Sequence, residues 1–380
     1  MGIRNLNPLE RPMPPGVRLP GIDVEKRFYL ELGIDPKSSN YDLLRALCLR
    51  GVQQRGIDKL KNKEQYYDRV KMELSVLKDL GFIDYILLNW DVLNFCHENE
   101  IPTGPGRGSA AGSLVLFLLR VTNVDPIKYD LFFERFVSKS RAKKTIVDGI
   151  TYLDGSLLAD VDNDISYDRR QEVIKYIEEQ HKGRTCKILT LNTLSSKLCV
   201  KECGKIVGEM PEDEVNQISS LIPKQFGKVA KLSQALEESD KFKEFADKNK
   251  KIFKIAKKLE GLNKNTGVHP SGIAISFYNI EEIMPMQKTN DGNLISAYDM
   301  NDVASLTVKF DILGLRTLSV VSDTCKRLGI KMEDIDVGLP EIYENFKFIE
   351  APKGLFQIEA DTNFKVCKKI APKNLEELSA

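Results

Sequence analysis

The sequence is poor in histidine and has no CxxC cysteine pair, and each shortage argues against a class of site. Its three histidines in 380 residues lie far apart, at His97, His181 and His269. They are too few and too dispersed for a zinc site or a histidine-rich phosphoesterase centre. None of the seven cysteines forms a CxxC pair, so we expect free thiols in a reducing compartment. The seven are Cys48, Cys96, Cys186, Cys199, Cys203, Cys325 and Cys367.

Long apolar runs are also absent. No stretch of about 18 apolar residues occurs, so we predict no membrane-spanning segment and no membrane partner. The start, MGIRNLNPLERP, lacks the apolar core of a signal peptide, and Leu6 stands where a myristoylation signal has Ser or Thr. We therefore expect a cytoplasmic protein, of a bacterium or of a phage-infected cell.

Charge of neither sign dominates. The formal net charge is +1, although 29% of the residues are charged and 42% are hydrophobic. This composition is typical of a globular protein, and the length suffices for two or three domains. A net charge near zero does not exclude a protein that binds phosphate with lysine and metal with aspartate, because the positive and negative charges of these side chains cancel.

Hydrophobic spacing predicts mixed secondary structure. Residues 1–40 are rich in Pro and Gly, which favours an extended lead-in. Three helices are predicted between residues 41 and 96, with Trp90 in the core, and another over residues 166–180. Two Asp-Gly pairs, at 148 and 154, predict hairpins within residues 145–162.

A second group of elements follows. Another hairpin is expected over residues 284–298, turning at 290–293, and residues 192–268 are nearly all helical in pattern with a lysine-rich outer face. Strands and helices mix without a βαβ repeat, so the expected fold class is α+β.

The first motif with chemical meaning is the glycine-rich stretch of residues 104–113, GPGRGSAAGS, followed by the apolar run of residues 114–119. A helix that begins near Ser109 would direct its free N–H groups at an anion, and phosphate is the natural ligand. The Rossmann and P-loop patterns both fail here. A glycine-rich turn before a buried helix is the alternative.

The second motif is the acidic run around Asp160 and Asp162. Side chains at i and i+2 of an extended strand point the same way, so these two carboxylates would converge on one Mg²⁺ site. A calcium loop is excluded, since its sixth position is Ile165 instead of Gly and its twelfth is Gln171 instead of Glu. A solvated acidic turn stays open.

The third motif is the strand pattern of residues 308–312, VKFDI. Its apolar residues alternate with Lys309 and Asp311, so a half-buried strand would present a cation and an anion side by side. A structural ion pair is the simplest explanation of this motif when it is considered alone.

Together, these motifs and several longer segments resemble the palm and thumb of bacterial DNA polymerase III alpha subunits, the replicative polymerases of family C. The segments are NVDPIKYDLFFERF, LNTLSSKLCVKECGKIVG, TGVHPSGIAIS, VKFDILGLRTL and GLFQIEADTNF, in that order along the chain. The resemblance extends from about residue 40 over nearly the whole chain. It implies a palm like that of polymerase-beta-type nucleotidyltransferases, with an inserted helical thumb.

The resemblance also assigns segments and residues. Residues 1–40 would be the lead-in, 41–191 and 269–318 the two parts of the palm, 192–268 the thumb, and 319–380 a truncated start of the fingers. Two Mg²⁺ ions would be held by Asp160, Asp162 and Asp311. The phosphates of a dNTP would be bound by Arg107, Gly108, Ser109 and Lys309.

Lysines in the helical insertion are the expected contacts to primer–template DNA. One set recurs at i, i+4 and i+8 of a helix, and the other lies where the family's thumb grips the duplex. A solvated basic face is the alternative. The residues are Lys197, Lys201, Lys205, Lys254, Lys257 and Lys258.

Departures from the family pattern limit these expectations. An extra hairpin-like stretch precedes Asp160, Ala159 replaces the usual proline, and Asn163 stands where an apolar residue is more common, which suggests that the strand ends near that point. The phosphoesterase-like domain, most of the fingers and the clamp-binding segment are not recognised. We therefore expect template-directed DNA synthesis that is incomplete without a second polypeptide or C-terminal region.

Two other functions remain as alternatives. The chain could be a non-catalytic DNA-binding fragment or a split subunit active only with a partner that carries the fingers. It could also be a smaller nucleotidyltransferase acting on a protein or metabolite, although such an enzyme has no need of the basic helical insertion.

Overall fold

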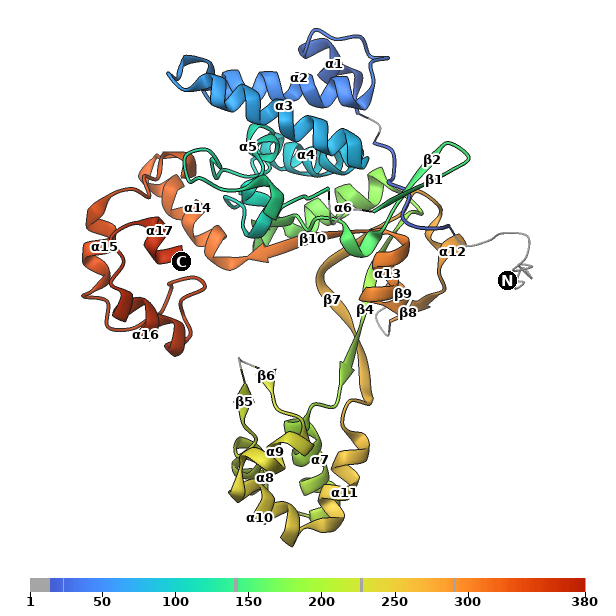
Figure 1. Cartoon of the computed structure of the whole chain (residues 1–380), viewed down its shortest axis with the longest axis vertical. Coiled ribbons are helices and arrows are strands. Elements are labelled where there is room, and N and C mark those ends of the chain that lie inside the picture. Colours follow the sequence, from blue (N-terminus) through green and yellow to red (C-terminus); the bar gives the residue numbers. More distant parts are fainter. Residues whose placement is uncertain (1–13, 23, 140–142, 226–227, 290–291, 380) are drawn as a thin grey trace. The chain divides into compact units, whose positions relative to one another are not determined.

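The computed structural model describes residues 14–22, 24–139, 143–225, 228–289 and 292–379. The chain folds into two compact units, one formed by Met1–Lys187 together with Pro270–Ala380, and the other by Ile188–His269 (Figure 1). Helices and strands are mixed and the main sheet has both parallel and antiparallel pairs, which confirms the predicted α+β class.

The main sheet has six strands in the order β3-β10-β7-β4-β9-β8. β10 runs parallel to β3, with Asp311 opposite Asp162, and antiparallel to β7, with Asp311 opposite Gly272. Strand β10 is confirmed, because Val308, Phe310 and Ile312 are buried as their alternation predicts. The strands are β3 (Asp162–Ser166), β4 (Thr185–Thr193), β7 (Asn263–Ile275), β8 (Met286–Lys288), β9 (Leu294–Asp299) and β10 (Val308–Leu315).

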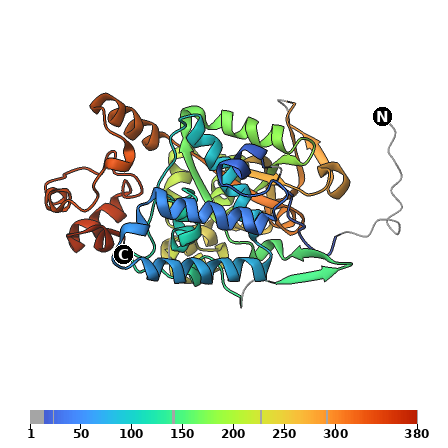
Figure 2. The ribbon, with the colours of Figure 1, turned by 90° about the horizontal axis from the view of Figure 1, so that it is seen from above.

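The helices predicted before residue 96 are confirmed as α2 (Asn40–Gln54), α3 (Lys63–Leu80) and α4 (Ile83–Glu98). Viewed from above, the blue helices cover the central part of the first unit (Figure 2). α2 also approaches the short buried helix α5 (Leu114–Leu118). A Cβ on Gly51 would lie 2.3 Å from the backbone oxygen of Leu118, so only glycine permits this contact.

The lead-in is not wholly extended, which corrects that expectation for its described part. A helix, α1 (Lys26–Glu31), forms within it because Phe28 and Tyr29 reach the core. The Phe28 ring packs edge-on against Trp90 at a centroid distance of 5.1 Å. Trp90 is 2% exposed and so belongs to the core as predicted. Burial of these aromatic rings outweighs the local Pro and Gly content.

One of the two Asp-Gly hairpins is confirmed. β1 (Lys144–Val147) pairs with β2 (Ile150–Leu153), and both turn residues between them have positive φ, as a type I′ turn requires. The hairpin predicted at the Asp154–Gly155 pair is wrong. There the Asp154 side chain accepts a hydrogen bond from the Ser156 amide and a 3₁₀ turn follows. Strands β8 and β9 form the later predicted hairpin, whose turn includes residues outside the described ones.

The remaining helices of the first unit follow β3 or the later strands. The helix predicted over residues 166–180 begins later, as α6 (Arg170–Gln180), after a 3₁₀ turn. In the described part of the chain, no helix is both long enough and apolar enough to cross a membrane. The others are α12 (Ile280–Ile283), α13 (Met300–Leu306), α14 (Arg316–Leu328), α15 (Pro340–Phe346), α16 (Asp361–Ile370) and α17 (Leu375–Ser379).

The second unit is mainly helical, as predicted for residues 192–268. Its core contains Cys199, Phe242 and Ile252, and two very short strands form a hairpin of their own. The elements are α7 (Ser196–Gly208), α8 (Glu212–Ser220), β5 (Lys224–Gln225), β6 (Lys228–Val229), α9 (Leu232–Glu238), α10 (Asp240–Lys248) and α11 (Lys250–Leu259).

Candidate metal and phosphate site

Three carboxylates meet at the β3–β10 edge of the sheet, and we call them the carboxylate trio: Asp160, Asp162 and Asp311. One oxygen from each lies within 4.8 Å of the others; Asp160 is exposed, Asp162 half-buried and Asp311 buried. Asp162 and Asp311 meet because β3 and β10 pair in parallel register. The structure therefore brings together the three carboxylates that the sequence indicated.

The local geometry of Asp160 and Asp162 differs from the expectation. The strand does not end near Asn163 but begins at Asp162, and Asn163 is a buried strand residue. Asp160 precedes the strand, so the two side chains are not both placed by strand alternation. Ladder pairing with β10 starts at Asp162, and this tertiary contact sets the boundary.

Helix α4 holds the backbone beside the trio. The Tyr85 hydroxyl donates a 2.6 Å hydrogen bond to the carbonyl of Ala159, and the ring packs edge-on against Phe310. The amide of Asn163 donates to the carbonyl of Val161 and to Asn89 of α4, at 3.3 Å each. These bonds restrain the segment on both sides of Asp160.

Two cations are paired with carboxylates at this site. Lys309 Nζ lies 2.7 Å from Asp311, as the alternation in β10 predicted, and Arg107 Nη2 lies 2.8 Å from Asp164. Arg107 Nε is also 3.7 Å from Asp162. The trio and Asp164 thus outnumber Arg107 and Lys309 by four carboxylates to two cations.

Burial and charge act on the ionisation of these groups. Burial lowers the pKa of Lys309, but its hydrogen bond to Asp311 and the nearby charges of the trio outweigh burial, so the pKa of Lys309 is raised. Burial raises the pKa of Asp164, against the opposing effect of Arg107. Hard carboxylate oxygens in excess over their cations are the donor set that a magnesium ion prefers, so the trio fits such an ion.

The glycine-rich stretch lies against the same carboxylates. The Gly104 amide donates to the carbonyl of Asp164 at 2.8 Å, and a Cβ on Gly104 would come within 2.7 Å of the Asp164 side chain. Gly108 has a φ of 64° and its Cβ position is 3.9 Å from an oxygen of Asp162. Glycine is therefore required where this loop approaches the metal candidates.

The helix predicted to begin near Ser109 takes a different form. Residues Gly108–Gly112 make a 3₁₀ turn, and the α-helix, α5, begins only at Leu114. The amides of Leu114 and Val115 bond to the buried carboxylate of Glu73, at 2.9 and 3.0 Å. These two amides at the N-terminus of α5 are therefore already bonded to a side chain of the protein and are not free to bind a phosphate.

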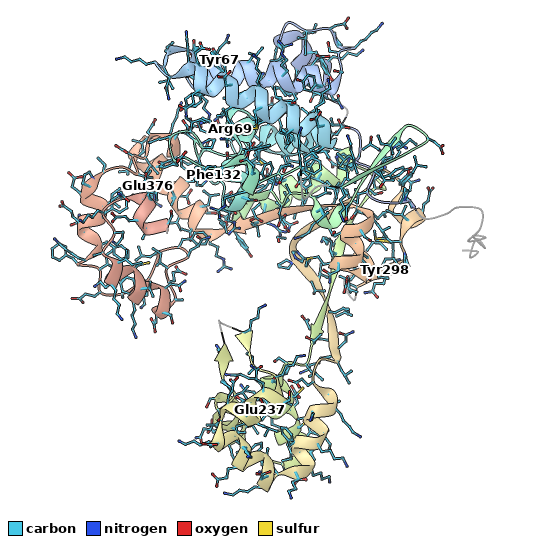
Figure 3. All side chains as sticks on the ribbon, in the orientation of Figure 1. Tyr67, Arg69, Phe132, Glu237, Tyr298 and Glu376 are labelled. Atoms are coloured by element: carbon cyan, nitrogen blue, oxygen red, sulfur yellow. The ribbon has the colours of Figure 1, made fainter. Side chains whose placement is uncertain are left out.

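Beside Ser109 is an open hollow of about 490 Å³, which we call the Ser109 hollow. It is lined by Ser109, Phe132, Glu134 and Arg135. The Phe132 side chain is 62% exposed and is labelled in Figure 3. Sequence reasoning missed Arg135 as a candidate phosphate ligand. Its place within the segment NVDPIKYDLFFERF, which follows the glycine motif, was the available signal.

The six lysines proposed as DNA contacts all lie in the second unit. Lys197, Lys201 and Lys205 are on α7, where the first two are half-buried and Lys205 pairs with Glu212 at 3.0 Å. On α11, burial of Ile252 and Ala256 leaves the opposite face to exposed lysines. The exposed α11 lysines include Lys254, Lys257 and Lys258.

Comparison with known proteins places the chain in a family. The family model described as the bacterial DNA polymerase III alpha NTPase domain matches residues 42–314. The chain is 33% identical over 350 residues to the DNA polymerase III subunit alpha of Bacillus subtilis, which covers 89% of this chain and 30% of the relative. The chain is 30% identical over 392 residues to the DNA polymerase III subunit alpha of Campylobacter jejuni, and this match covers 98% of the chain and 31% of the relative. It is 34% identical over 330 residues to the DNA polymerase III subunit alpha of Staphylococcus aureus, and this match covers 84% of the chain and 29% of the relative.

The chain spans about three tenths of the length of these relatives. The matched region includes the glycine-rich loop, all three carboxylates of the trio and Lys309. Because the family match extends over well more than half of its residues, the chain belongs to the bacterial DNA polymerase III alpha family.

Proposed function

We propose that the chain carries the nucleotidyl-transfer site of a DNA polymerase that transfers a nucleotide from a dNTP to a primer 3′ hydroxyl under the direction of a template. One observation carries this proposal: the trio of Asp160, Asp162 and Asp311 converges beside the Gly108–Gly112 turn. The names of the relatives, all DNA polymerase III alpha subunits, support it.

In this proposal the sheet unit is a palm of the polymerase-beta-like type, in two parts, and the helical unit is the thumb. The lead-in precedes the palm, and the segment from residue 319 begins the fingers. The mixed sheet with the trio at its β3–β10 edge supports this assignment, as does the separate compactness of Ile188–His269.

The trio would hold two magnesium ions, which, when bound, would lower the pKa of the primer hydroxyl and neutralise charge on the leaving pyrophosphate. The chain's own groups would orient the triphosphate. Amides of the Gly108–Ser109 turn donate hydrogen bonds to phosphate oxygens, and Arg107, Lys309 and Arg135 contribute positive charge around them. Catalysis of this kind depends on positioning and on electrostatic stabilisation.

Primer–template DNA would be bound through its phosphates by the lysines of α7 and α11. The lysines of α11 support DNA binding more strongly than those of α7, because they are exposed. On α7, Lys197 and Lys201 are half-buried and Lys205 is already paired with Glu212. In solution we expect these contacts to give salt-dependent and sequence-independent binding.

The fingers and the clamp-binding segment would be supplied by a further region or by a second polypeptide. Exposed apolar side chains near the C-terminal end, Phe356 and Ile370, support an additional surface there. A DNA-binding fragment without catalysis is the other candidate, and the intact trio favours the enzyme over it.

The test is primer extension by the purified chain, alone and with a polypeptide carrying the region that follows in the relatives. We expect Mg²⁺-dependent extension in the combined sample and little by the chain alone. Asp160→Asn and Asp162→Asn should abolish extension while folding is retained, because Asn is isosteric and relieves charge repulsion. Near-wild-type extension by either variant would refute the assignment of the trio.

A further inference from the structure

Glu73 is a buried carboxylate with four hydrogen-bond donors around it. Its side chain is fully buried, and it accepts from the Nε of Arg69 at 2.7 Å and from the hydroxyl of Ser113 at 2.9 Å. The amides of Leu114 and Val115 supply the other two hydrogen bonds. Because all four partners donate, the network accommodates the ionised carboxylate, which only accepts.

This carboxylate occupies the positive end of α5. The helix has five residues, all buried, so its first amides have no access to solvent. Glu73 satisfies two of them and complements the helix dipole. The end of the glycine-rich loop, at Ser113 and Leu114, is thereby fixed to α3.

Arg69 extends the same network to both sides of the Ser109 hollow. Its Nη2 donates to the carbonyl of Gly112 at 2.9 Å and to the carbonyl of Leu131 at 3.0 Å. Gly112 ends the turn that carries Ser109, and Leu131 lies shortly before Arg135. A single guanidinium therefore binds one carbonyl from each of the two segments whose residues line the hollow (Figure 3 labels Arg69 and Phe132).

The two walls are also in direct backbone contact. A Cβ on Gly112 would lie 2.6 Å from the carbonyl oxygen of Phe132, so the walls touch where no side chain intervenes. A buried ion pair contributes little net stability compared with apolar packing, and its best-attested use is to specify one arrangement. Here the arrangement specified is the spacing of Ser109 from Arg135.

We propose that Arg69 and Glu73 are positioning residues for nucleotide binding: they fix the Gly108–Gly112 turn against the segment that carries Arg135, so that both walls of the Ser109 hollow are in place before the triphosphate arrives. Neither side chain would touch the nucleotide. The inference deepens the proposed function and rests on it, because it takes the Ser109 hollow as the phosphate site.

The test uses the whole chain and two conservative variants, Glu73→Gln and Arg69→Lys. Gln has the same shape, but it turns an NH₂ group toward donors, and Lys keeps the charge but cannot bind two carbonyls and a carboxylate as a planar fork does. The matched control is Tyr176→Phe, which removes a 2.8 Å hydrogen bond to Asp91 between α6 and α4. The readouts are amide hydrogen exchange and the affinity for magnesium–dATP.

We expect amides of the Gly108–Gly112 turn, Leu114 and Val115 to exchange at least about tenfold faster in both variants, with α4 and β10 unchanged. The dissociation constant for magnesium–dATP should rise about tenfold or more, since the loss of one charged hydrogen bond is of that size. Tyr176→Phe should change the melting temperature but neither of these readouts.

The outcomes separate this inference from the proposed function. If magnesium–dATP protects nothing at Gly108 and Ser109 in the wild-type chain, the phosphate site and the proposed function fail. If it protects them with equal affinity in the wild type and in either folded variant, the phosphate site stands and the positioning role is refuted. If neither variant folds, the pair is purely structural and the inference is overturned.

Discussion

Replacing Asp162 with Asn removes one charge from the carboxylate trio and changes no shape. The oxygens of the trio lie within 4.8 Å of one another. At that separation two unit charges repel by about 1 kcal/mol in water and by about 3.5 kcal/mol at an effective dielectric constant of roughly 20. Arg107, with its Nε 3.7 Å from Asp162, offsets part of this repulsion. We therefore expect Asp162→Asn to stabilise the metal-free chain by about 1 kcal/mol.

The same substitution should remove the response to magnesium. A cation at ten times its dissociation constant stabilises the folded chain by about 1.4 kcal/mol, which raises the melting temperature by a few degrees. Asp162→Asn lacks one of the three ligands and should show a higher melting temperature without magnesium and almost no increase with it. The measurement is thermal unfolding with and without Mg²⁺ at about ten times its dissociation constant, on the wild type and the variant.

Asp168→Asn provides the control. Asp168 is an exposed residue of the same acidic stretch and is not a member of the trio, so its replacement should leave the magnesium response intact. A wild-type magnesium response in Asp162→Asn, or an equal loss in both variants, would refute the idea that the trio binds the ion.

Two other predictions concern other parts of the chain. Neutralising Lys254, Lys257 and Lys258 on α11 should weaken duplex DNA binding and reduce the slope of log affinity against log salt by roughly 0.9 for each lysine–phosphate interaction removed; an unchanged slope would place the DNA elsewhere. Burial raises the pKa of Asp91 from its ordinary 3.8 to about 6. Between these two pH values the folded state keeps a proton that the unfolded state has released, so the free energy of unfolding falls as pH rises from 3.8 to about 6. Asp91→Asn should therefore stabilise the chain by about 3 kcal/mol at about pH 7 and hardly at all at about pH 3.5. Urea unfolding at the two pH values measures this difference, and equal effects at both would contradict the raised pKa of Asp91.

Local sequence pattern predicted correctly those elements whose conformation depends mainly on residues close together in the chain. The alternation of Val308, Phe310 and Ile312 predicted β10, because these three residues share one strand face and all are buried. The Asp148–Gly149 pair gave the β1–β2 turn, since both residues can adopt positive φ. The pair at Asp154 failed because the aspartate side chain accepts a hydrogen bond from the amide of Ser156, and a 3₁₀ turn forms there instead of a hairpin.

The candidate site was predicted as a set of residues but not as an arrangement. The spacing of Asp160 and Asp162 indicated a pair of ligands, and the third carboxylate was identified through the family motif. Where β3 begins depends on pairing with β10, a contact between segments far apart in the chain. No local pattern contains that contact.

The glycine-rich loop shows the same division between local pattern and long-range contact. The glycines of residues 104–113 were enough to predict that the backbone of this loop can approach other groups closely, because glycine has no side chain. The packing of α3 beside α5 decided that α5 starts only at Leu114 and that its first amides bond to Glu73. Glu73 carries no signal in the sequence, because i, i+4 pairs such as Arg69 and Glu73 are common on solvated helix faces.

The sequence by itself indicated most of the candidate side chains for metal and phosphate binding, because oxygen ligands, glycine flexibility and hydrophobic period are properties of residues and their neighbours. Only the tertiary structure decided which of them meet. Asp311 reaches Asp162 through strand register, and Ser109 and Arg135 line one hollow, whose two bordering segments are joined by the largely buried guanidinium of Arg69 through the carbonyls of Gly112 and Leu131. Burial makes those long-range contacts strong and specific, since a buried polar group without a partner costs about 1–3 kcal/mol and so selects the one arrangement that satisfies it.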